Sequence, residues 1–309
     1  MRVVADARRF EERFPHVILT IGSFDGVHRG HARIISRVVE EARARGGTAA
    51  LMTLHPHPRV YFAPGNAPNI LTCPGKKQQL LAEAGLDVLF VLPFNADVAS
   101  MPREQFVEEI ILARCHAEKL VVGHDFAFGK DALGSYDYLK EVAPQLGLEV
   151  EEVPPLIIAG ERVSSTLVRE AILQGDMAQA ARLLGRPYSM LGEVARGRGI
   201  GRDLGFPTAN IRPNTGAVPA HGVYAAKVRR RDAAHVAAVN IGVAPTIRQT
   251  DITIEAYLLD FDQDIVGESI EIEFHRRLRP EKYFSGREEL MNAIASDVQA
   301  VWRYFNKSA

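Results

Sequence analysis

The chain has 309 residues, of which 47% are hydrophobic and 24% are charged, and its formal net charge at pH 7 is −1. This length predicts two domains, and the composition is that of a globular protein with a buried core. The near balance of charge excludes a global attraction for nucleic acid or for an anionic membrane, so any anion site must be local.

Short apolar runs alternate with amphipathic stretches between His16 and Glu152. The apolar runs predict buried strands over His16–Ile21, Ala49–Thr53, Val88–Leu92, Lys119–Val122 and Leu148–Val153. Stretches with apolar residues at helical spacing predict helices over Ala32–Arg45, Lys76–Ala84, Arg103–Ala113 and Tyr136–Gln145. This alternation predicts βαβ units and a mostly parallel sheet, which is a Rossmann-like α/β domain.

The periodicity changes in the second half of the chain. Two further helices are predicted over Ser165–Leu173 and Met177–Leu184, before a break at Gly185-Arg186-Pro187. Mostly β-rich runs follow, over Met190–Arg196, Gly222–Arg229, Ala234–Ile241, Ile252–Leu259 and Ser269–His275. Their spacing predicts a small antiparallel barrel or a sandwich, and the spacing of apolar residues predicts a closing helix over Gly286–Tyr304. The domain boundary is expected near residue 186, with domains at 1–185 and 186–309.

A glycine-rich turn, Gly22–His31, follows the first strand directly and opens the first long helix. A helix start offers unpaired N–H groups and a positive dipole end, and glycines let a ligand approach the backbone closely. His28 and His31 lie on one face near that end, where they can donate hydrogen bonds to phosphate oxygens. The alternatives are histidines that only cap or pack, and a zinc site, which lacks both the His-Glu-x-x-His spacing and a third ligand.

A second glycine-rich segment, Gly197–Asn210, has four glycines in nine residues, interleaved with two arginines. Backbone N–H groups of such a loop can surround phosphates. The segment is neither a Walker A motif nor a Rossmann fingerprint, and a plain turn is the alternative. Thr208 and Asn210, two residues apart, would direct both side-chain oxygens to one face of a strand, which suits Mg²⁺ and phosphate.

These segments, with others in the same order, resemble the motifs of the bacterial bifunctional riboflavin kinase/FAD synthetases. In the first half they are Phe24–His31, Pro56–Arg59, Gly123–Gly129 and Ser164–Arg169. In the second half they are Gly197–Asn210, His221–Ala225, Asn240–Gly242, Pro245–Thr246 and Leu278–Lys282. The sequence departs from the family pattern at His55, Ala127, Leu167, Ala244 and Tyr257.

The resemblance implies an enzyme that phosphorylates riboflavin to FMN and then adenylylates FMN to FAD, with ATP as substrate and Mg²⁺ as cofactor. In the first half, His28 and His31 would be catalytic, and the flavin would contact His57 and Asp125. ATP would be bound there by Gly22, Phe24, Asp25, Ser165, Thr166 and Arg169. Adenylyl transfer by direct displacement needs positioning and charge stabilisation but no covalent residue.

In the second half, the resemblance implies that Glu255 accepts the proton of the ribityl hydroxyl as that oxygen attacks the γ-phosphate of ATP. Spacing alone does not distinguish Glu255 from Asp251. Thr208 and Asn210 would hold Mg²⁺, and Arg279 would contact the flavin. ATP would be bound by Gly197, Gly199, Arg202, Gly205 and Pro207.

Two other functions stay open. One is an enzyme that keeps a single activity, the kinase, because its loop matches the family more closely than the third and fourth motifs of the first half. The other is a flavin- or nucleotide-binding regulator without turnover, against which the His28/His31 pair and the Thr208, Asn210 and Glu255 set argue. The sequence leaves the oligomeric state open.

Three features predict a cytoplasmic protein without a membrane partner. The two cysteines, Cys73 and Cys115, are too few for a disulfide framework and are expected to be reduced. The charged segment Met1–Pro15 lacks the apolar region of a signal peptide. No apolar run approaches the roughly 20 residues that span a bilayer.

Overall fold

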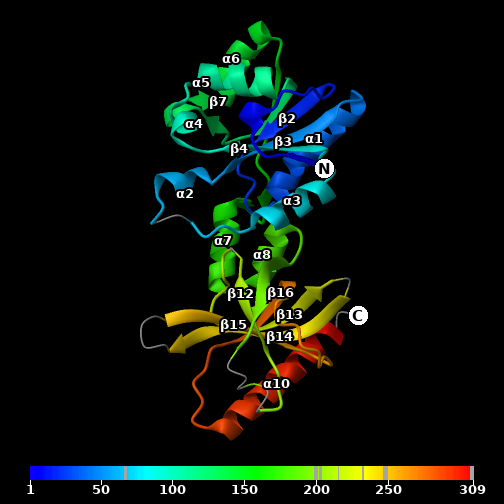
Figure 1. Ribbon diagram of the computed structural model, residues 1–309, viewed down its shortest axis with the longest axis vertical. Coiled ribbons are helices and arrows are strands. Elements are labelled where there is room, and N and C mark those ends of the chain that lie inside the picture. Colours follow the sequence, from blue (N-terminus) through cyan, green and yellow to red (C-terminus); the bar gives the residue numbers. More distant parts are fainter. Residues whose placement is uncertain are drawn as a thin grey trace. The chain divides into compact units, whose positions relative to one another are not determined.

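The computed structural model of this chain describes residues 1–65, 68–197, 201, 204–214, 216–231, 233–245 and 250–306 (Figure 1). The chain divides into two compact units. The first consists of Met1–Pro68 and Pro74–Ser164, and the second of Asn69–Cys73 and Ser165–Ala309. Within the described ranges, no helix combines the length and apolarity that a membrane crossing requires.

The first unit is built on a six-stranded parallel sheet in the order β1-β4-β3-β2-β5-β8. Its strands are β1 (Arg2–Val4), β2 (Val17–Ile21), β3 (Thr48–His55), β4 (Val88–Pro93), β5 (Ala117–Gly123) and β8 (Glu149–Val153). The five predicted strands and the parallel α/β arrangement are confirmed. The additional strand, β1, is only three residues long, which is too short for a periodic pattern to appear in the sequence.

The helices of this unit are α1 (Arg29–Ala44), α2 (Pro58–Phe62), α3 (Pro74–Glu83), α4 (Ala96–Ser100), α5 (Arg103–Gln105), η2 (Phe106–Arg114) and α6 (Tyr136–Val142). The longer ones cover both faces of the sheet, with α1 and α3 on one face and η2 and α6 on the other. Ile18 of β2 belongs to the hydrophobic cluster of α1 and α3, whereas its neighbour Leu19 belongs to the cluster of η2 and α6. Successive strand residues point to opposite faces, so both faces of β2 are buried.

One predicted helix has a different form. The stretch expected as a single helix over Arg103–Ala113 begins as α5 and continues as η2, a π-helix of nine residues. Apolar spacing indicates that a stretch is helical, but it does not distinguish the hydrogen-bonding pattern of a π-helix from that of an α-helix. Short elements complete the unit: η1 (Ala7–Arg9), β6 (Ala127–Phe128), η3 (Lys130–Ala132), β7 (Gly134–Ser135), η4 (Ala143–Leu146), β9 (Ile157–Ile158) and β10 (Glu161–Arg162).

A network of ion pairs joins α1 to the edge of the sheet. The side chain of Lys119 on β5 is 9% exposed, and its Nζ lies 3.0 Å from Glu41 on α1 and 2.6 Å from Glu151 on β8. Arg37 of α1 also pairs with Glu151, at 2.6 Å. Hydrogen bonds from Arg37 and Lys119 lower the pKa of Glu151 to about 2. The ionised form of Glu151 is therefore stabilised by folding.

Glu151→Gln is expected to loosen the β5–β8 edge at neutral pH and to have less effect in acid. Because the folded pKa of about 2 is below the ordinary value of 4.5, the stabilisation is complete above pH 4.5 and is lost as the pH falls toward 2. At pH 7 we expect a loss of about 1–2 kcal/mol in the local opening free energy. Hydrogen exchange of β5 and β8 amides at pH 7 and 3 measures it, with Glu108→Gln as an exposed control. An equal loss at both pH values would contradict the conclusion that the ionised form of Glu151 stabilises this edge of the sheet.

The second unit contains a closed antiparallel barrel in the order β11-β12-β15-β14-β13-β16. Its strands are β11 (Tyr188–Ala195), β12 (Ala209–Pro213), β13 (Gly222–Arg230), β14 (Ala233–Pro245), β15 (Thr250–Leu258) and β16 (Ser269–Pro280). Of the two architectures that the sequence left open, the barrel is the one observed. Two helices, α7 (Ser165–Gln174) and α8 (Met177–Leu184), precede it as predicted.

The predicted closing helix is α10 (Arg287–Asn306), which packs on the outer face of the barrel (Figure 1). Val301 of α10 is fully buried in a cluster with Ala225 of β13 and Ala238 of β14. Tyr257 of β15 packs against the same cluster. This contact fixes which face of the strands lies beneath the helix.

Candidate functional sites

The turn Gly22–His31 connects β2 to α1 and has an unusual backbone. Three of its residues have positive φ angles: Phe24 at 46°, Gly26 at 86° and Val27 at 41°. The backbone of a residue other than glycine is strained in this region of φ, and it keeps such a conformation only where neighbouring groups hold it. Phe24 and Val27 are both buried in the hydrophobic cluster of α1, which holds the turn in this conformation.

His28 is the N-cap of α1. Its Nδ1 accepts a hydrogen bond from the backbone N–H of His31 at 3.2 Å, and only 5% of the residue is exposed. His28 therefore does cap the helix, which is one of the roles that the sequence left open. This role does not exclude a role in phosphate binding, because a neutral ring whose Nδ1 accepts carries its proton on Nε2, which is a donor.

His31 stacks on His28, with ring centroids 3.6 Å apart and ring planes 15° apart. Burial, together with the nearby His28 and Lys77, holds the pKa of His31 well below its ordinary value. The ring is therefore neutral at pH 7. Within the described part of the chain, its buried Nδ1 has no hydrogen-bond partner. Such a nitrogen can form a hydrogen bond with a ligand that enters the turn.

Lys77 belongs to this turn region, although no sequence motif indicates it. It lies on α3, and its Nζ donates a hydrogen bond to the carbonyl oxygen of Ser23 at 2.7 Å. Burial lowers the pKa of Lys77. Asp25, a residue of the same turn that is 1% exposed, acts in the opposite direction and raises it. The sequence contains no local signal for this contact, since a lysine on an amphipathic helix ordinarily faces solvent.

The other predicted residues of the first half are distributed over several elements. His57 caps α2, where its Nδ1 accepts from the Arg59 N–H at 3.1 Å. Asp125 is 73% exposed and pairs with Arg162 at 2.5 Å. Gly22 follows β2 at the start of the turn.

The predicted triphosphate-binding residues of the fourth motif belong to the second unit. Ser165 and Thr166 are the first two residues of α7. Arg169 lies further along α7, and its Nε donates to the carbonyl oxygen of Asn69 at 2.8 Å. The roles assigned to these three residues stay predictions.

Strand register assembles a polar row on the barrel. Asn210 of β12 is paired with Glu255 of β15, and Glu255 is paired on its other side with Asn240 of β14. Residues directly opposite each other in an antiparallel pair point to the same face, with Cβ atoms roughly 5 Å apart. Tyr257 and Ala238, two residues along from Glu255 and Asn240, face α10. The polar row therefore lies on the outer face that α10 partly covers.

The same row distinguishes the two candidate bases. Glu255 is opposite both Asn210 and Asn240, whereas Asp251 is paired with Ala244, near the other end of β15. The row continues through Val223 of β13 to Arg279 of β16. Register thus places the predicted base, one predicted metal ligand and the predicted flavin contact on one face.

Two glycines of the segment Gly197–Asn210 lie against the predicted metal ligands. A Cβ on Gly197 would be 2.0 Å from the side-chain nitrogen of Asn210, and a Cβ on Gly201 would be 2.9 Å from Oγ1 of Thr208. Any larger residue would displace these side chains. Gly205 has a φ of 84°, in the left-handed region that favours glycine, and Pro207 directly precedes Thr208. Gly199 and Arg202, also predicted to bind ATP, lie outside the described residues.

Arg279 is held by the closing helix. Its Nε lies 2.9 Å from Oδ1 and its Nη2 lies 2.7 Å from Oδ2 of Asp297, a residue of α10 that is 8% exposed. The guanidinium carbon also lies 5.6 Å from the centre of the Phe284 ring. A flavin contact by Arg279 stays a prediction, and any such contact would involve a guanidinium already fixed by Asp297.

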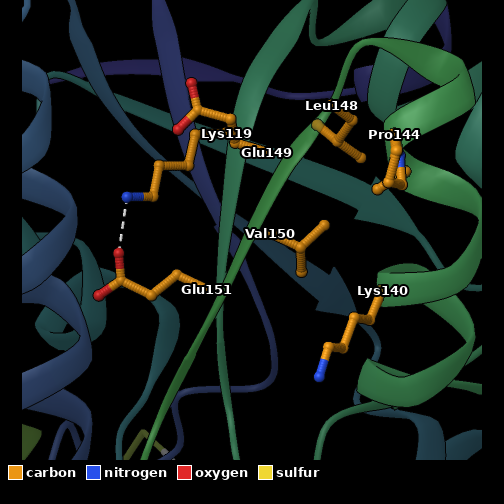
Figure 2. Close-up of a pocket in the computed structure, with 8 residues that line it drawn as sticks. Lys119, Lys140, Pro144, Leu148, Glu149, Val150 and Glu151 are labelled. Carbon is orange, nitrogen blue, oxygen red and sulfur yellow. Dashed lines mark ion pairs between the residues drawn. The ribbon is translucent and has the colours of Figure 1, made fainter.

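A pocket of about 410 Å³ lies on the first unit (Figure 2). It is lined by residues of β5, α6, η4 and β8: Lys119, Lys140, Ala143, Pro144, Leu148, Glu149, Val150 and Glu151. None of the predicted site residues is among them. Lys119 and Glu151 belong to the ion-pair network described above, which gives them a structural role.

Comparison with known proteins assigns each half of the chain to a family. A family model described as FAD synthetase matches residues 11–167, and a model described as riboflavin kinase matches residues 184–305. A bifunctional riboflavin kinase/FMN adenylyltransferase of Haemophilus influenzae is 36% identical over 93% of this chain and 94% of its own. The protein of the same description from Pseudomonas fluorescens is 36% identical over 97% of this chain and 96% of its own.

A further relative and a solved structure agree with this. The bifunctional riboflavin kinase/FMN adenylyltransferase of Escherichia coli K12 is 34% identical over 93% of this chain and 92% of its own. A crystal structure from Streptococcus pneumoniae, described as a macrolide-efflux protein, matches with a TM-score of 0.89 at 27% identity over 97% of both chains. The structural likeness concerns the fold.

Proposed function

The chain belongs to the family of bifunctional riboflavin kinase/FMN adenylyltransferases, and from this membership we propose which of its residues carry out the two reactions. It is an enzyme with an N-terminal FAD synthetase domain and a C-terminal riboflavin kinase domain. Its substrates are riboflavin, FMN and ATP. We propose domains at 1–185 and 186–309, although α7 and α8 belong to the same compact unit as the barrel. The charge balance and the cysteine content support a cytoplasmic location without a nucleic-acid partner.

In the kinase reaction, the terminal ribityl hydroxyl of riboflavin attacks the γ-phosphorus of ATP, and ADP leaves. Glu255 accepts the hydroxyl proton as the new P–O bond forms and the bond to the β-phosphate oxygen breaks. The observation that carries this assignment is the row in which Glu255 lies between Asn210 and Asn240. The three residues share one outer face of the barrel, and Arg279 of the same row is proposed to contact the flavin.

Both reactions use ATP, and enzymes of this kind generally need a divalent metal ion. We propose Mg²⁺, held in the kinase domain by the side-chain oxygens of Thr208 and Asn210 together with phosphate oxygens. Hydroxyl and amide oxygens are suitable ligands for this hard cation. Gly197 and Gly201 approach these two side chains so closely that a Cβ at either position would collide with them, so glycine at both positions lets the segment lie directly against the proposed ligands. When bound, the ion neutralises charge that develops on the phosphates.

In the adenylyl-transfer reaction, a phosphate oxygen of FMN attacks the α-phosphorus of ATP, and pyrophosphate leaves. The Nε2–H of His28 and the neutral ring of His31 donate hydrogen bonds to phosphate oxygens, and the N-terminus of α1 adds its positive dipole. Ser165, Thr166 and Arg169 are proposed to hold the triphosphate, with Gly22, Phe24 and Asp25 in the turn. His57 and Asp125 are proposed to contact the flavin.

The product profile tests the assignment of both activities. Purified protein given riboflavin, ATP and Mg²⁺ is expected to form FMN first and FAD second, as separated by chromatography. Given FMN and ATP, it is expected to form FAD and pyrophosphate in equal amounts. EDTA should stop both reactions, and Mg²⁺ should restore them. Formation of FMN without FAD would mean that the protein has only the kinase activity. Flavin binding without consumption of ATP would indicate a regulator.

A further inference from the structure

The carbonyl oxygen of Ser23 is anchored from two sides by elements outside the Gly22–His31 turn. Lys77 Nζ of α3 donates to it at 2.7 Å, and Thr53 Oγ1 of β3 donates at 3.3 Å. A trans peptide is planar, so fixing the carbonyl of Ser23 also fixes the N–H of Phe24, which points the opposite way. The sheet and a second helix thus determine the orientation of a peptide within the phosphate-binding turn.

The anchored peptide is the one that enters the strained part of the turn. Phe24, the residue after Ser23, has a φ of 46°, and Val27 has a φ of 41°. Strained backbone of this kind is retained only where neighbouring groups over-determine it, and it is concentrated at functional sites. Lys77 is one of the groups that hold it, through a hydrogen bond to a residue 54 positions away.

Lys77 also brings a partly buried positive charge to the turn. Burial lowers its pKa, and the buried carboxylate of Asp25 opposes that shift. An ammonium group has three donors, of which the Ser23 carbonyl takes one. The charge also contributes, after burial and His28, to the low pKa of His31. Its field therefore reaches the ring that is proposed to contact phosphate.

We propose that Lys77 is a positioning residue of the adenylyl-transfer site, which holds the Ser23–Phe24 peptide in the conformation that receives the phosphates of ATP and supplies positive charge beside them. This inference rests on the proposed role of the Gly22–His31 turn. A preorganised cation next to a phosphate site stabilises charge without reorganisation during the reaction.

Lys77→Met is the main test, because Met keeps the length of the apolar stem and removes the charge and the donors. In FAD formation from FMN, kcat/KM for ATP is expected to fall about tenfold to a hundredfold. FMN formation from riboflavin should stay within twofold. The matched control is Lys140→Met, which removes an exposed lysine of the same unit and should leave both activities unchanged.

Two further measurements separate this role from a loss of folding. Lys77→Gln keeps a donor for the Ser23 carbonyl but removes the charge, so it should still lower kcat/KM for ATP at least fivefold, by less than Lys77→Met. In Lys77→Met, the pKa of His31 followed by NMR should rise, because a neighbouring cation is gone. Wild-type kinetics of FAD formation in the folded Met or Gln variant would overturn the inference.

A variant of the turn itself distinguishes failure of this inference from failure of the site assignment. His28→Asn removes the imidazole proposed to contact ATP. If it lowers FAD formation while Lys77→Met and Lys77→Gln do not, the role of Lys77 is wrong and the site stands. If none of the three variants lowers FAD formation, the assignment of the turn is wrong.

Discussion

Glu255→Gln is expected to lower kcat for FMN formation from riboflavin by about 10²–10⁴-fold, while FAD formation from added FMN stays within twofold of the wild type. A carboxamide has nearly the shape of the carboxylate, but it cannot accept the proton of the ribityl hydroxyl. The position opposite Asn210 and Asn240 is preserved, so the barrel strands keep their register. The loss is therefore expected in kcat and not in the binding of riboflavin.

Initial rates of both reactions, measured by chromatography of the flavins, test this prediction. Glu193→Gln is the matched control, because it neutralises an exposed carboxylate on β11 of the same barrel. Asp251→Asn tests the competing base on β15. Loss of the kinase reaction in the Asp251 variant but not in the Glu255 variant would transfer the role to Asp251.

His28→Asn is expected to show the reverse pattern, with FAD formation lowered by about 10²–10³-fold and FMN formation near the wild-type rate. Asparagine is a good N-cap residue, so it can replace the hydrogen bond that Nδ1 of His28 accepts from the His31 N–H. It cannot replace the Nε2–H donor. The change thus separates the proposed contact with phosphate from the observed capping of α1.

His28→Ala measures the capping contribution, since alanine removes both functions and is expected to cost about 1 kcal/mol more in stability than asparagine. His16→Asn is a control, because His16 is an exposed histidine paired with Glu118. Near-normal FAD formation in His28→Asn together with a strong loss in His28→Ala would mean that His28 acts only as a cap.

The two variants also test each other. A mixture of His28→Asn, which should still make FMN, and Glu255→Gln, which should still make FAD from FMN, is expected to convert riboflavin to FAD. This outcome would show that each variant is folded and lacks one activity only. Equal loss of both activities in either variant would contradict the division of the chemistry between two sites.

The sequence alone determined the class of fold and the places where phosphate chemistry is expected. Five of the six sheet strands of the first unit, its longer helices, the β-rich second half and the closing helix follow from local periodicity, because buried faces repeat every two residues in strands and about every 3.6 in helices. The turn before α1 and the segment Gly197–Asn210 were recognisable from their glycines and the polar residues beside them. Their chemistry lies within a few consecutive residues.

Only the tertiary structure decided which distant side chains lie side by side. The place of Glu255 between Asn210 and Asn240 depends on strand register, which local spacing does not fix. The contacts of Lys77 with Ser23 and of Asp297 with Arg279 arise from helix packing over separations of 54 and 18 residues. The neutral state of His31 depends on burial, because desolvation acts on a group only after the chain has packed around it.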